Sequence, residues 1–200
     1  MARDAAPENP VFVVTGTSGA GKGTLEKEVL RRLPELALAV SATTRERRPG
    51  EEDGREYWFL SENEFQRRAR DGEFLEHVTH EWGKRAGTLR SEIDRIRAEG
   101  RVPLLDLETQ GALLVRDHVP GSVTIFIKAP NFEELERRLR ERATESAGEI
   151  ELRLRVAREQ LASEQEFDHV IVNDELGRAV DELEEIVRRT LARRSYSVAT

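Results

Sequence analysis

The sequence contains no cysteine, one methionine, two tryptophans and two tyrosines in 200 residues. Without cysteine the chain can form no disulfide, no thiolate nucleophile and no cysteine-ligated metal site, which excludes a disulfide-stapled secreted scaffold. It has no apolar run near the roughly 20 residues that a membrane span requires, and its first ten residues lack the apolar stretch of a signal peptide. We therefore expect a cytoplasmic protein with no membrane partner.

Positive charge is in the minority, with 32 Lys and Arg against 39 Asp and Glu, for a net charge of -7. A general nucleic-acid binder needs a large basic surface, so we expect no nucleic-acid partner. A chain of this length suits one compact domain with small movable inserts.

The most informative feature that the sequence does contain is a glycine-rich stretch near the N-terminus. The apolar run 11–15 leads into Gly16-x-x-x-x-Gly21-Lys22, and a helical pattern follows. This spacing is typical of a P-loop, in which glycines let successive backbone N–H groups point into a hollow at the positive end of the helix dipole. Lys22 adds a mobile positive charge for the β- and γ-phosphates. The alternative is a glycine turn that only connects strand to helix, but strand, glycines, lysine and helix stand in the order that phosphate binding requires.

Short apolar runs alternate with helical patterns along the whole chain. Continuous apolar strands separated by helices indicate a parallel sheet covered on both faces. We therefore predict an α/β fold of the P-loop three-layer sandwich type with a parallel central sheet. The predicted core strands are 11–15, 36–41, 102–107, 123–128 and 169–173. Ligands bind beyond the carboxyl ends of such strands, so the loops after Thr15, Ser41, Leu107 and Val172 are the places where a site is expected.

The loop after the second predicted strand, residues 41–57, is rich in arginine. Arg45 and Arg48 are planar forks suited to phosphate, and Tyr57 offers a hydroxyl donor close by. A solvated charge run is the alternative reading of an arginine-rich loop. Its position after the second strand of a P-loop domain favours phosphate binding.

Five motifs together resemble the guanylate kinase family. They are Ser-x-Thr-Thr-Arg-x-x-Arg-x-Gly-Glu at 41–51, Gly-x-x-Tyr at 54–57, Phe-Leu-Glu at 74–76, Leu-Asp-Leu-Glu-Thr-Gln-Gly at 105–111 and Val-Ile-Val-Asn-Asp at 170–174. The resemblance covers nearly the whole chain and implies transfer of a phosphoryl group from ATP to GMP, with Mg²⁺ as cofactor. It also implies a disordered lead at 1–10, a kinase domain at 11–194 with its P-loop at 16–24, a GMP-binding subdomain at about 41–88, a mobile lid at about 138–153, and a tail at 195–200.

The family's site residues carry over position by position. The implied ATP-binding residues are Gly16, Thr17, Ser18, Gly19, Ala20, Gly21, Lys22, Gly23, Thr24 and Asn173. The implied GMP-binding residues are Ser41, Arg45, Arg48, Glu51, Tyr57, Glu76, Thr88, Asp106 and Glu108. The implied catalytic residues are Lys22, Arg45, Arg138, Arg142 and Arg153, of which the last three belong to the lid.

The chemistry of guanine supports a role for Glu76. Guanine presents N1–H and an exocyclic amine on one edge, and a carboxylate accepts both, whereas adenine presents an acceptor at N1. A site built on hydrogen bonds rejects the wrong analogue by about 10⁴-fold in favourable cases. Without the motif, Glu76 would be an ordinary surface carboxylate. Asp106 and Glu108 alternate at the end of a buried run and need a partner, which is either a magnesium–nucleotide complex or one of the many arginines.

The chain departs from the family pattern at a few positions. Gly23 stands where a Ser or Thr usually holds Mg²⁺, so we expect the ion to be held through nucleotide oxygens and water, with Thr24 and Asp106 as the candidate direct contacts. Ala86 stands where a tyrosine often donates to the GMP phosphate, and Lys84 or Arg85 could compensate. Glu108 replaces an aspartate, and Ala143 replaces a lid glycine.

Two other functions remain open from the sequence. A non-catalytic guanylate kinase-like binding module would have no need to keep Lys22, Arg45 and Arg48. A sister P-loop kinase could act on another small phosphorylated acceptor, although Ser41 and Glu76 favour guanine. The sequence is compatible with a monomer or a homodimer. The four histidines, His77, His80, His118 and His169, show no metal-ligand spacing and are interpreted as ordinary surface or strand-end residues.

Overall fold

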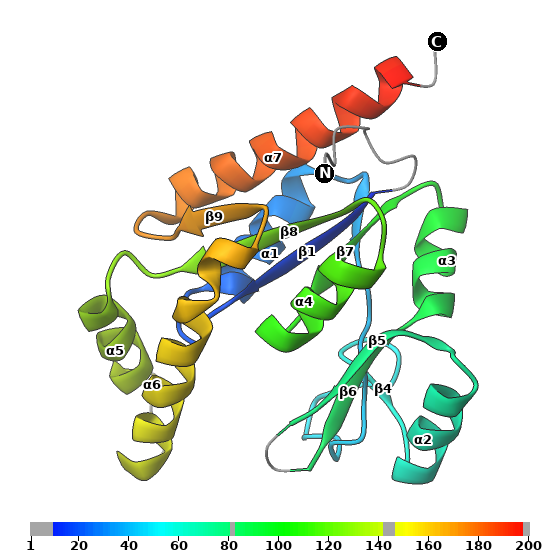
Figure 1. Cartoon of the computed structure of the whole chain (residues 1–200), viewed down its shortest axis with the longest axis horizontal. Coiled ribbons are helices and arrows are strands. Elements are labelled where there is room, and N and C mark those ends of the chain that lie inside the picture. The colour runs from blue at the N-terminus through cyan, green and yellow to red at the C-terminus, as the bar shows by residue number, and fades with distance from the viewer. Residues whose placement is uncertain (1–9, 81–82, 142–146, 198–200) are drawn as a thin grey trace.

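A five-stranded parallel sheet forms the centre of the molecule. The structure, a computed structural model, describes residues 10–80, 83–141 and 147–197. The strands are β1 (Val11–Gly16), β2 (Leu36–Leu38), β7 (Val102–Asp106), β8 (Ser122–Lys128) and β9 (His169–Val172), in the order β2-β7-β1-β8-β9. All six residues of β1 are buried, and β1 lies between β7 and β8 in the sheet (Figure 1). The predicted α/β fold with a parallel central sheet is confirmed.

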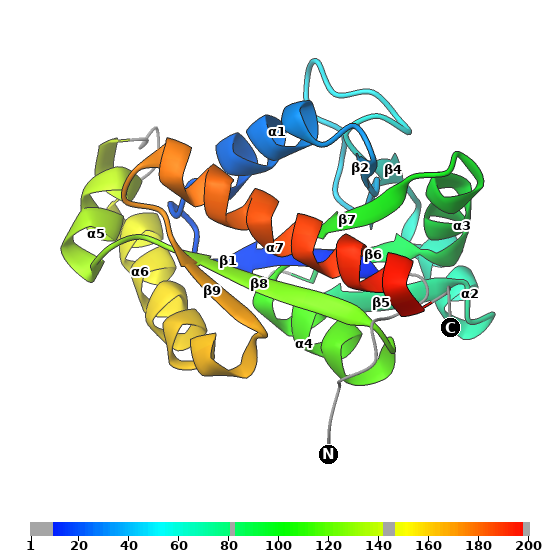
Figure 2. The same cartoon turned by 90° about the horizontal axis from the view of Figure 1, so that it is seen from above.

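Helices cover both faces of this sheet, which explains why β1 reads as a continuous apolar run. Phe12 and Val14 pack with α1 (Lys22–Arg32) and α7 (Leu176–Ser197) on one face. Val11 and Val13 pack with α3 (Arg90–Ala98) and α4 (Thr109–His118) on the other face. Figure 2 shows α1 and α7 side by side over the strands, with α4 on the opposite side.

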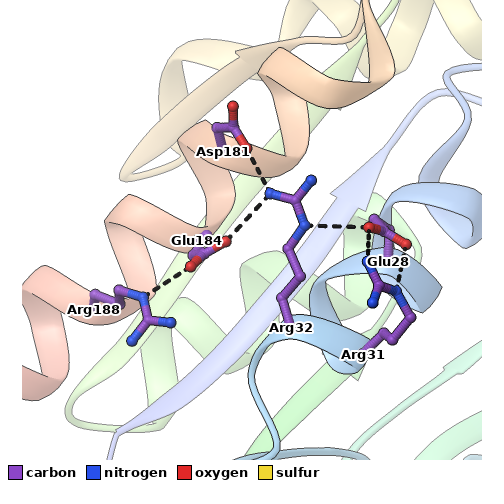
Figure 3. Close-up of polar contacts among 6 residues, drawn as sticks. All are labelled: Glu28, Arg31, Arg32, Asp181, Glu184 and Arg188. Atoms are coloured by element: carbon purple, nitrogen blue, oxygen red, sulfur yellow. Dashed lines mark hydrogen bonds and ion pairs between the residues drawn. The ribbon is translucent and has the colours of Figure 1, made fainter.

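An ion-pair cluster joins the two helices of the first face. Arg32, at the end of α1, reaches α7, where its guanidinium lies 2.5 Å from Asp181 Oδ1 and 3.4 Å from Glu184 Oε2 (Figure 3). Glu28, one turn earlier, also accepts from Arg32, at 3.2 Å. Because these side chains lie at the surface, from 22% to 71% exposed, the cluster adds only modestly to the apolar packing of α1 against α7.

A second sheet is inserted between β2 and α3. Its strands are β3 (Ala42–Thr43), β4 (Trp58–Phe59), β5 (Phe74–Thr79) and β6 (Arg85–Leu89), in the order β4-β3-β6-β5, and α2 (Glu62–Arg70) packs against it. The strand β6 is not predicted from the sequence, because Arg-Ala-Gly-Thr-Leu shows no apolar alternation. Pairing with β3 and β5 makes it a strand. Of the predicted strand 36–41, only Leu36–Leu38 form a strand, and β3 of the second sheet begins after it, at Ala42.

The third part consists of α5 (Phe132–Glu141) and α6 (Ala147–Ala162), followed by a short 3₁₀ turn at Glu164–Glu166. Asn131 caps α5, since its Oδ1 accepts from Glu134 N at 2.8 Å. Leu135, Leu139 and Leu154 contribute to a small apolar core of their own. The predicted lid, 138–153, includes residues 142–146, which lie outside the described residues, and its boundaries stay a prediction.

No helix in the described ranges is both long enough and apolar enough to cross a membrane.

Candidate active site

The turn between β1 and α1 has the backbone geometry of a phosphate cradle. A Cβ at Gly16 would lie 1.9 Å from the carbonyl oxygen of Ile127, so the strand can end there only as glycine. Gly19 and Gly21 have φ angles of 85° and 87°, a left-handed conformation that glycine adopts without strain. Helix α1 begins at Lys22, whose ammonium donates to Gly16 O at 3.0 Å. Backbone amides, a helix N-terminus and a lysine therefore converge on one hollow.

Asn173 supports this turn from behind. Its side-chain amide donates to Ala20 O at 2.7 Å, and a Cβ at Gly21 would lie 2.5 Å from the same nitrogen. Arg138 donates to the carbonyl of Asn173 at 3.1 Å and to Glu134 Oε1 at 2.8 Å. A shallow hollow of about 420 Å³ lies on this side of the P-loop. Its lining includes Gly19, Gly21, Thr24, Arg138, Asn173 and Leu176.

A cleft of about 450 Å³ lies between the P-loop and the inserted sheet. From the core it is lined by Gly16, Ser18, Lys22, Asp106, Leu107, Glu108, Gly111 and Gln160. From the inserted sheet and its loops it is lined by Ser41, Thr43, Arg45, Tyr57, Glu76, Val78, His80, Lys84, Ala86 and Gly87. The structure thus brings nine of the residues predicted for the site together around one space.

Arg45 is held in place by a two-pronged ion pair. Its guanidinium donates to both oxygens of Glu51, at 3.0 and 2.8 Å, and packs over the ring of Tyr57 at 5.2 Å. Glu51 also accepts from the backbone N–H of Arg48 at 2.8 Å, and these donors lower the pKa of its carboxyl. Glu51 therefore orients the fork of Arg45 rather than facing the cleft itself. The side chain of Arg48 is exposed and does not line the cleft.

Glu76 is a buried carboxylate, with only 6% of the residue exposed. One oxygen accepts from the backbone N–H of Thr88 at 2.8 Å. The other lies against α4, where a Cβ at Gly111 would be 2.9 Å away. Burial raises the pKa of Glu76, opposed by hydrogen bonds from Thr88 and by the charge of His80. Its place at the floor of the cleft depends on glycine at 111.

A second buried carboxylate, Glu26, lies one turn along α1 from Lys22 and is 4% exposed. Its Oε1 has no hydrogen-bond partner among the described residues. Burial and the neighbouring Asp106 raise the pKa of Glu26 to about 8, against the opposing charge of Lys22. Burial likewise raises the pKa of Asp106, which Lys22 opposes. Sequence reasoning missed Glu26, although a charged side chain between the buried Leu25 and Val29 was a visible signal.

His80, interpreted from sequence as an ordinary strand-end residue, lies in the cleft instead. Its Nδ1 is 3.0 Å from Glu108 Oε2, and this hydrogen bond raises the pKa of His80. Lys84 lines the same cleft and so remains the candidate to compensate for Ala86. Arg85 is directed to α2, where its Nε lies 2.6 Å from Glu62.

The two predicted lid arginines that the structure describes, Arg138 and Arg153, do not line the cleft. Arg138 lies on the Asn173 side of the P-loop, Arg153 is exposed on α6, and Arg142 falls outside the described residues. Among the described residues, no three His, Asp or Glu side chains lie close enough to hold a metal ion. The carboxylates of Glu26, Asp106 and Glu108 interact electrostatically with Lys22, and carboxylate oxygens are the side-chain ligands that Mg²⁺ accepts.

This combination of fold and site defines a class of protein. A P-loop at the end of the central strand of a parallel sheet faces an inserted sheet that carries an arginine fork and a buried carboxylate. The chain therefore has the fold of a P-loop kinase, with an inserted sheet that forms the second wall of the cleft.

Comparison with known proteins gives the family. The model of the guanylate kinase family matches residues 8–190. A guanylate kinase of Rubrobacter xylanophilus is 46% identical over 182 residues, which cover 91% of this chain and 95% of that protein. One of Prochlorococcus marinus is 46% identical over 187 residues, 94% of this chain and 98% of the other. The crystal structure of guanylate kinase from Anaplasma phagocytophilum superimposes with a TM-score of 0.72 at 28% identity, covering 90% of this chain and 85% of that one. The chain belongs to the guanylate kinase family.

Proposed function

We propose that this protein transfers the γ-phosphoryl group of ATP to GMP, giving ADP and GDP. One observation carries the proposal: Glu76, a buried carboxylate, lines the same cleft as Lys22 of the P-loop, from the opposite sheet. The arrangement pairs a phosphate cradle with a group that recognises two adjacent hydrogen-bond donors. Family membership supports the same reaction.

ATP is assigned to the P-loop. Its β- and γ-phosphates receive backbone N–H groups of residues 16–24 and the ammonium of Lys22. The adenosine is assigned to the hollow beside Asn173 and Arg138, on the other side of Gly21. Asn173 holds the P-loop in shape, so its role there is to position the cradle as well as to border the adenosine.

GMP is assigned to the inserted sheet. Glu76 accepts from the N1–H and the exocyclic amine of guanine, while Ser41 and Thr88 complete the recognition of the base edge. Arg45, with Tyr57 beside it, takes the phosphate. The guanidinium of Arg45 already donates to both oxygens of Glu51, at 2.8 and 3.0 Å. The GMP phosphate therefore accepts from the remaining N–H groups of Arg45 or displaces part of the Arg45–Glu51 ion pair.

Transfer takes place directly between the two nucleotides, without a covalent intermediate on the protein. Catalysis then rests on alignment and on charge stabilisation. Lys22 stays with the γ-phosphoryl group as it moves, and Arg138, Arg142 and Arg153 are assigned to a lid whose closure excludes water. Mg²⁺, when bound, would supply positive charge against the phosphates, and Asp106 and Thr24 are the residues that would hold it, directly or through water.

Other features stay predictions. They are the limits of the GMP-binding subdomain and lid, the cytoplasmic location, the absence of nucleic-acid partners, and the choice between monomer and homodimer.

The decisive experiment is an ADP-release assay with ATP, Mg²⁺ and each of GMP, AMP, CMP and UMP. We expect turnover with GMP alone, because each of the other bases leaves Glu76 with at least one unmatched group. Turnover with none of the four while ATP still binds would point to a different acceptor or to a non-catalytic binding module. Turnover with AMP equal to that with GMP would contradict the role of Glu76.

A further inference from the structure

His80 directly follows the last residue of β5, and its side chain lies in a fixed position on the face of that strand that lines the cleft. Side chains alternate along a strand, so Glu76, Val78 and His80 point to the same side, and all three line the cleft. The backbone of His80 is fixed by the β5–β6 turn, since its N–H donates to Lys84 O at 2.8 Å and its carbonyl accepts from Gly83 N at 2.8 Å. The turn therefore holds the imidazole at one end of the strand that carries Glu76.

The imidazole contacts the core across the cleft. His80 Nδ1 lies 3.0 Å from Glu108 Oε2, and Glu108 is the residue between β7 and α4. The His80 side chain is largely covered, at 17% exposure, whereas that of Glu108 is 61% exposed. A second close approach lies deeper, where Glu76 meets Gly111 of α4. The inserted sheet and the core thus meet at two points along one strand, one of them polar and charged.

The charges around His80 favour its protonated form. The hydrogen bond with Glu108 raises the pKa of His80, and the nearby carboxylate of Glu76 adds to this effect. In return, His80 lowers the pKa of Glu108 and opposes the rise in the pKa of Glu76. The other charged and titratable groups in the cleft around the His80–Glu108 pair are Glu76, Lys84, Asp106 and Lys22.

We propose that His80 is a positioning residue for guanine recognition. Its contact with Glu108 joins the strand that carries Glu76 to the core, and this contact sets the width of the cleft. This inference rests on the proposed function for its kinetic consequences. The contacts of His80 described above are with Glu108 and the β5–β6 turn, beside Glu76, so we expect its effect to fall on GMP and not on ATP. When the imidazole loses its proton, the charged contact weakens and GMP binds less tightly.

The test is a steady-state comparison of wild type, His80→Gln and His77→Gln from pH 6 to pH 9 at saturating ATP. His77 is the matched control: it sits on the other face of the same strand, with its ring 6.0 Å from that of Phe65 and 5.6 Å from that of Phe74. We expect His80→Gln to raise the KM for GMP about tenfold at pH 6.5, the equivalent of ~1.4 kcal/mol. The ATP KM should change less than twofold, and His77→Gln should follow wild type.

The pH dependence separates positioning from a general loss of structure. The ratio of the two GMP KM values, variant over wild type, should fall as pH rises through the titration of His80; titrations shared by both proteins, including that of the GMP phosphate, cancel in this ratio. In a Glu108→Gln background, His80→Gln should add less than twofold. An unchanged GMP KM, a ratio independent of pH, or the same effect in the Glu108→Gln background would overturn the proposal.

A distance measurement tests whether His80 positions the inserted sheet, and it does not depend on activity. If wild type proves inactive with GMP, that result refutes the proposed function but not the positioning role of His80. The chain has no cysteine, so spin labels can be placed at Asn63→Cys on α2 and Gln110→Cys on α4, both exposed. We expect a narrow distance distribution at pH 6 that broadens in His80→Gln. Equal widths in both proteins would contradict the proposal.

Discussion

The two halves of the cleft are built by different means. On the P-loop side, recognition is a property of the backbone: Gly16, Gly19 and Gly21 permit a turn that few other sequences could form, and Lys22 adds a charge. On the inserted sheet, recognition is a property of side chains, each held by another side chain or by a neighbouring strand. Glu76 depends on the Thr88 N–H, and Arg45 depends on Glu51.

The difference reflects what each half binds. Phosphate is the same in every nucleotide, so a cradle of N–H groups suffices and carries no base specificity. A base must be distinguished from close analogues, which requires a buried group whose hydrogen bonds fail with the wrong partner. Substitutions on the P-loop side should therefore remove turnover, and those on the inserted sheet should change the acceptor requirement.

The largest expected effect is on the P-loop side. Lys22→Ala removes the one P-loop side chain that carries charge, and kcat should fall by about 10³-fold, the scale of losing a donor to the transition state. The circular dichroism spectrum and melting temperature should stay near those of wild type, because Lys22 is at the start of α1 and its ammonium donates a hydrogen bond to Gly16 O. A kcat within tenfold of wild type would place phosphate stabilisation elsewhere.

A smaller effect is expected where the core supports the base pocket. In Gly111→Ala the new Cβ would lie 2.9 Å from Glu76 Oε2, so the carboxylate must shift away from the position set by Thr88. We expect about a tenfold rise in the KM for GMP, with little change in the KM for ATP. Gly177→Ala on α7 is the matched control, since its Cβ would make only an ordinary contact at 3.9 Å. Equal kinetics for both variants would show that Glu76 has room to move.

The smallest effect on activity, but a clear one on stability, is expected at Glu26. The pKa of Glu26 is raised to about 8 in the folded protein from an ordinary value of 4.5. Between these values the folded state binds more protons than the unfolded state, so raising the pH across this range lowers the free energy of unfolding. Glu26→Gln cannot ionise, and it should be more stable than wild type by up to about 5 kcal/mol at pH 9, on the scale of about 1.4 kcal/mol per pKa unit.

Urea unfolding at pH 4, 6, 8 and 9 measures this difference. At pH 4, below both pKa values, the two proteins should agree closely, because the protonated acid and the amide are similar in shape and charge. By pH 6 the unfolded Glu26 is ionised while the folded one is not, so the difference should already be about 2 kcal/mol. Glu28→Gln on the same helix is the control: Arg31 and Arg32 lower the pKa of Glu28, so this variant should gain no stability as pH rises. A constant difference between Glu26→Gln and wild type across the four pH values would refute the titration of Glu26.

The sequence predicted the P-loop half more completely than the other half. Spacing along the chain is enough for a backbone cradle, because the residues from Gly16 to Lys22 are neighbours in both sequence and space. The core strands were likewise predictable, since each is a continuous apolar run. The strand β6 was missed because its residues form a strand only through pairing with β3 and β5.

The missed contacts share one cause, which is that they join residues far apart in the chain. Nothing in the sequence pairs His80 with Glu108, sets Glu76 against Gly111, or brings Glu26 near Asp106. The resemblance to guanylate kinases supplied the residues of the cleft and included Glu51 among those that bind GMP. In the structure the carboxylate of Glu51 lies behind Arg45 and accepts from its guanidinium. Long-range side-chain geometry is what the structure adds.

The most direct test of a cleft divided between phosphate and base recognition is calorimetric titration of Glu76→Gln with GMP and, separately, with a non-hydrolysable ATP analogue and Mg²⁺. The amide keeps the size of the carboxylate but cannot accept from both guanine donors. The account predicts that GMP binding weakens by about 10²-fold or more, while the Kd of the ATP analogue changes less than twofold. Equal weakening of both ligands, or unchanged GMP binding, would contradict it.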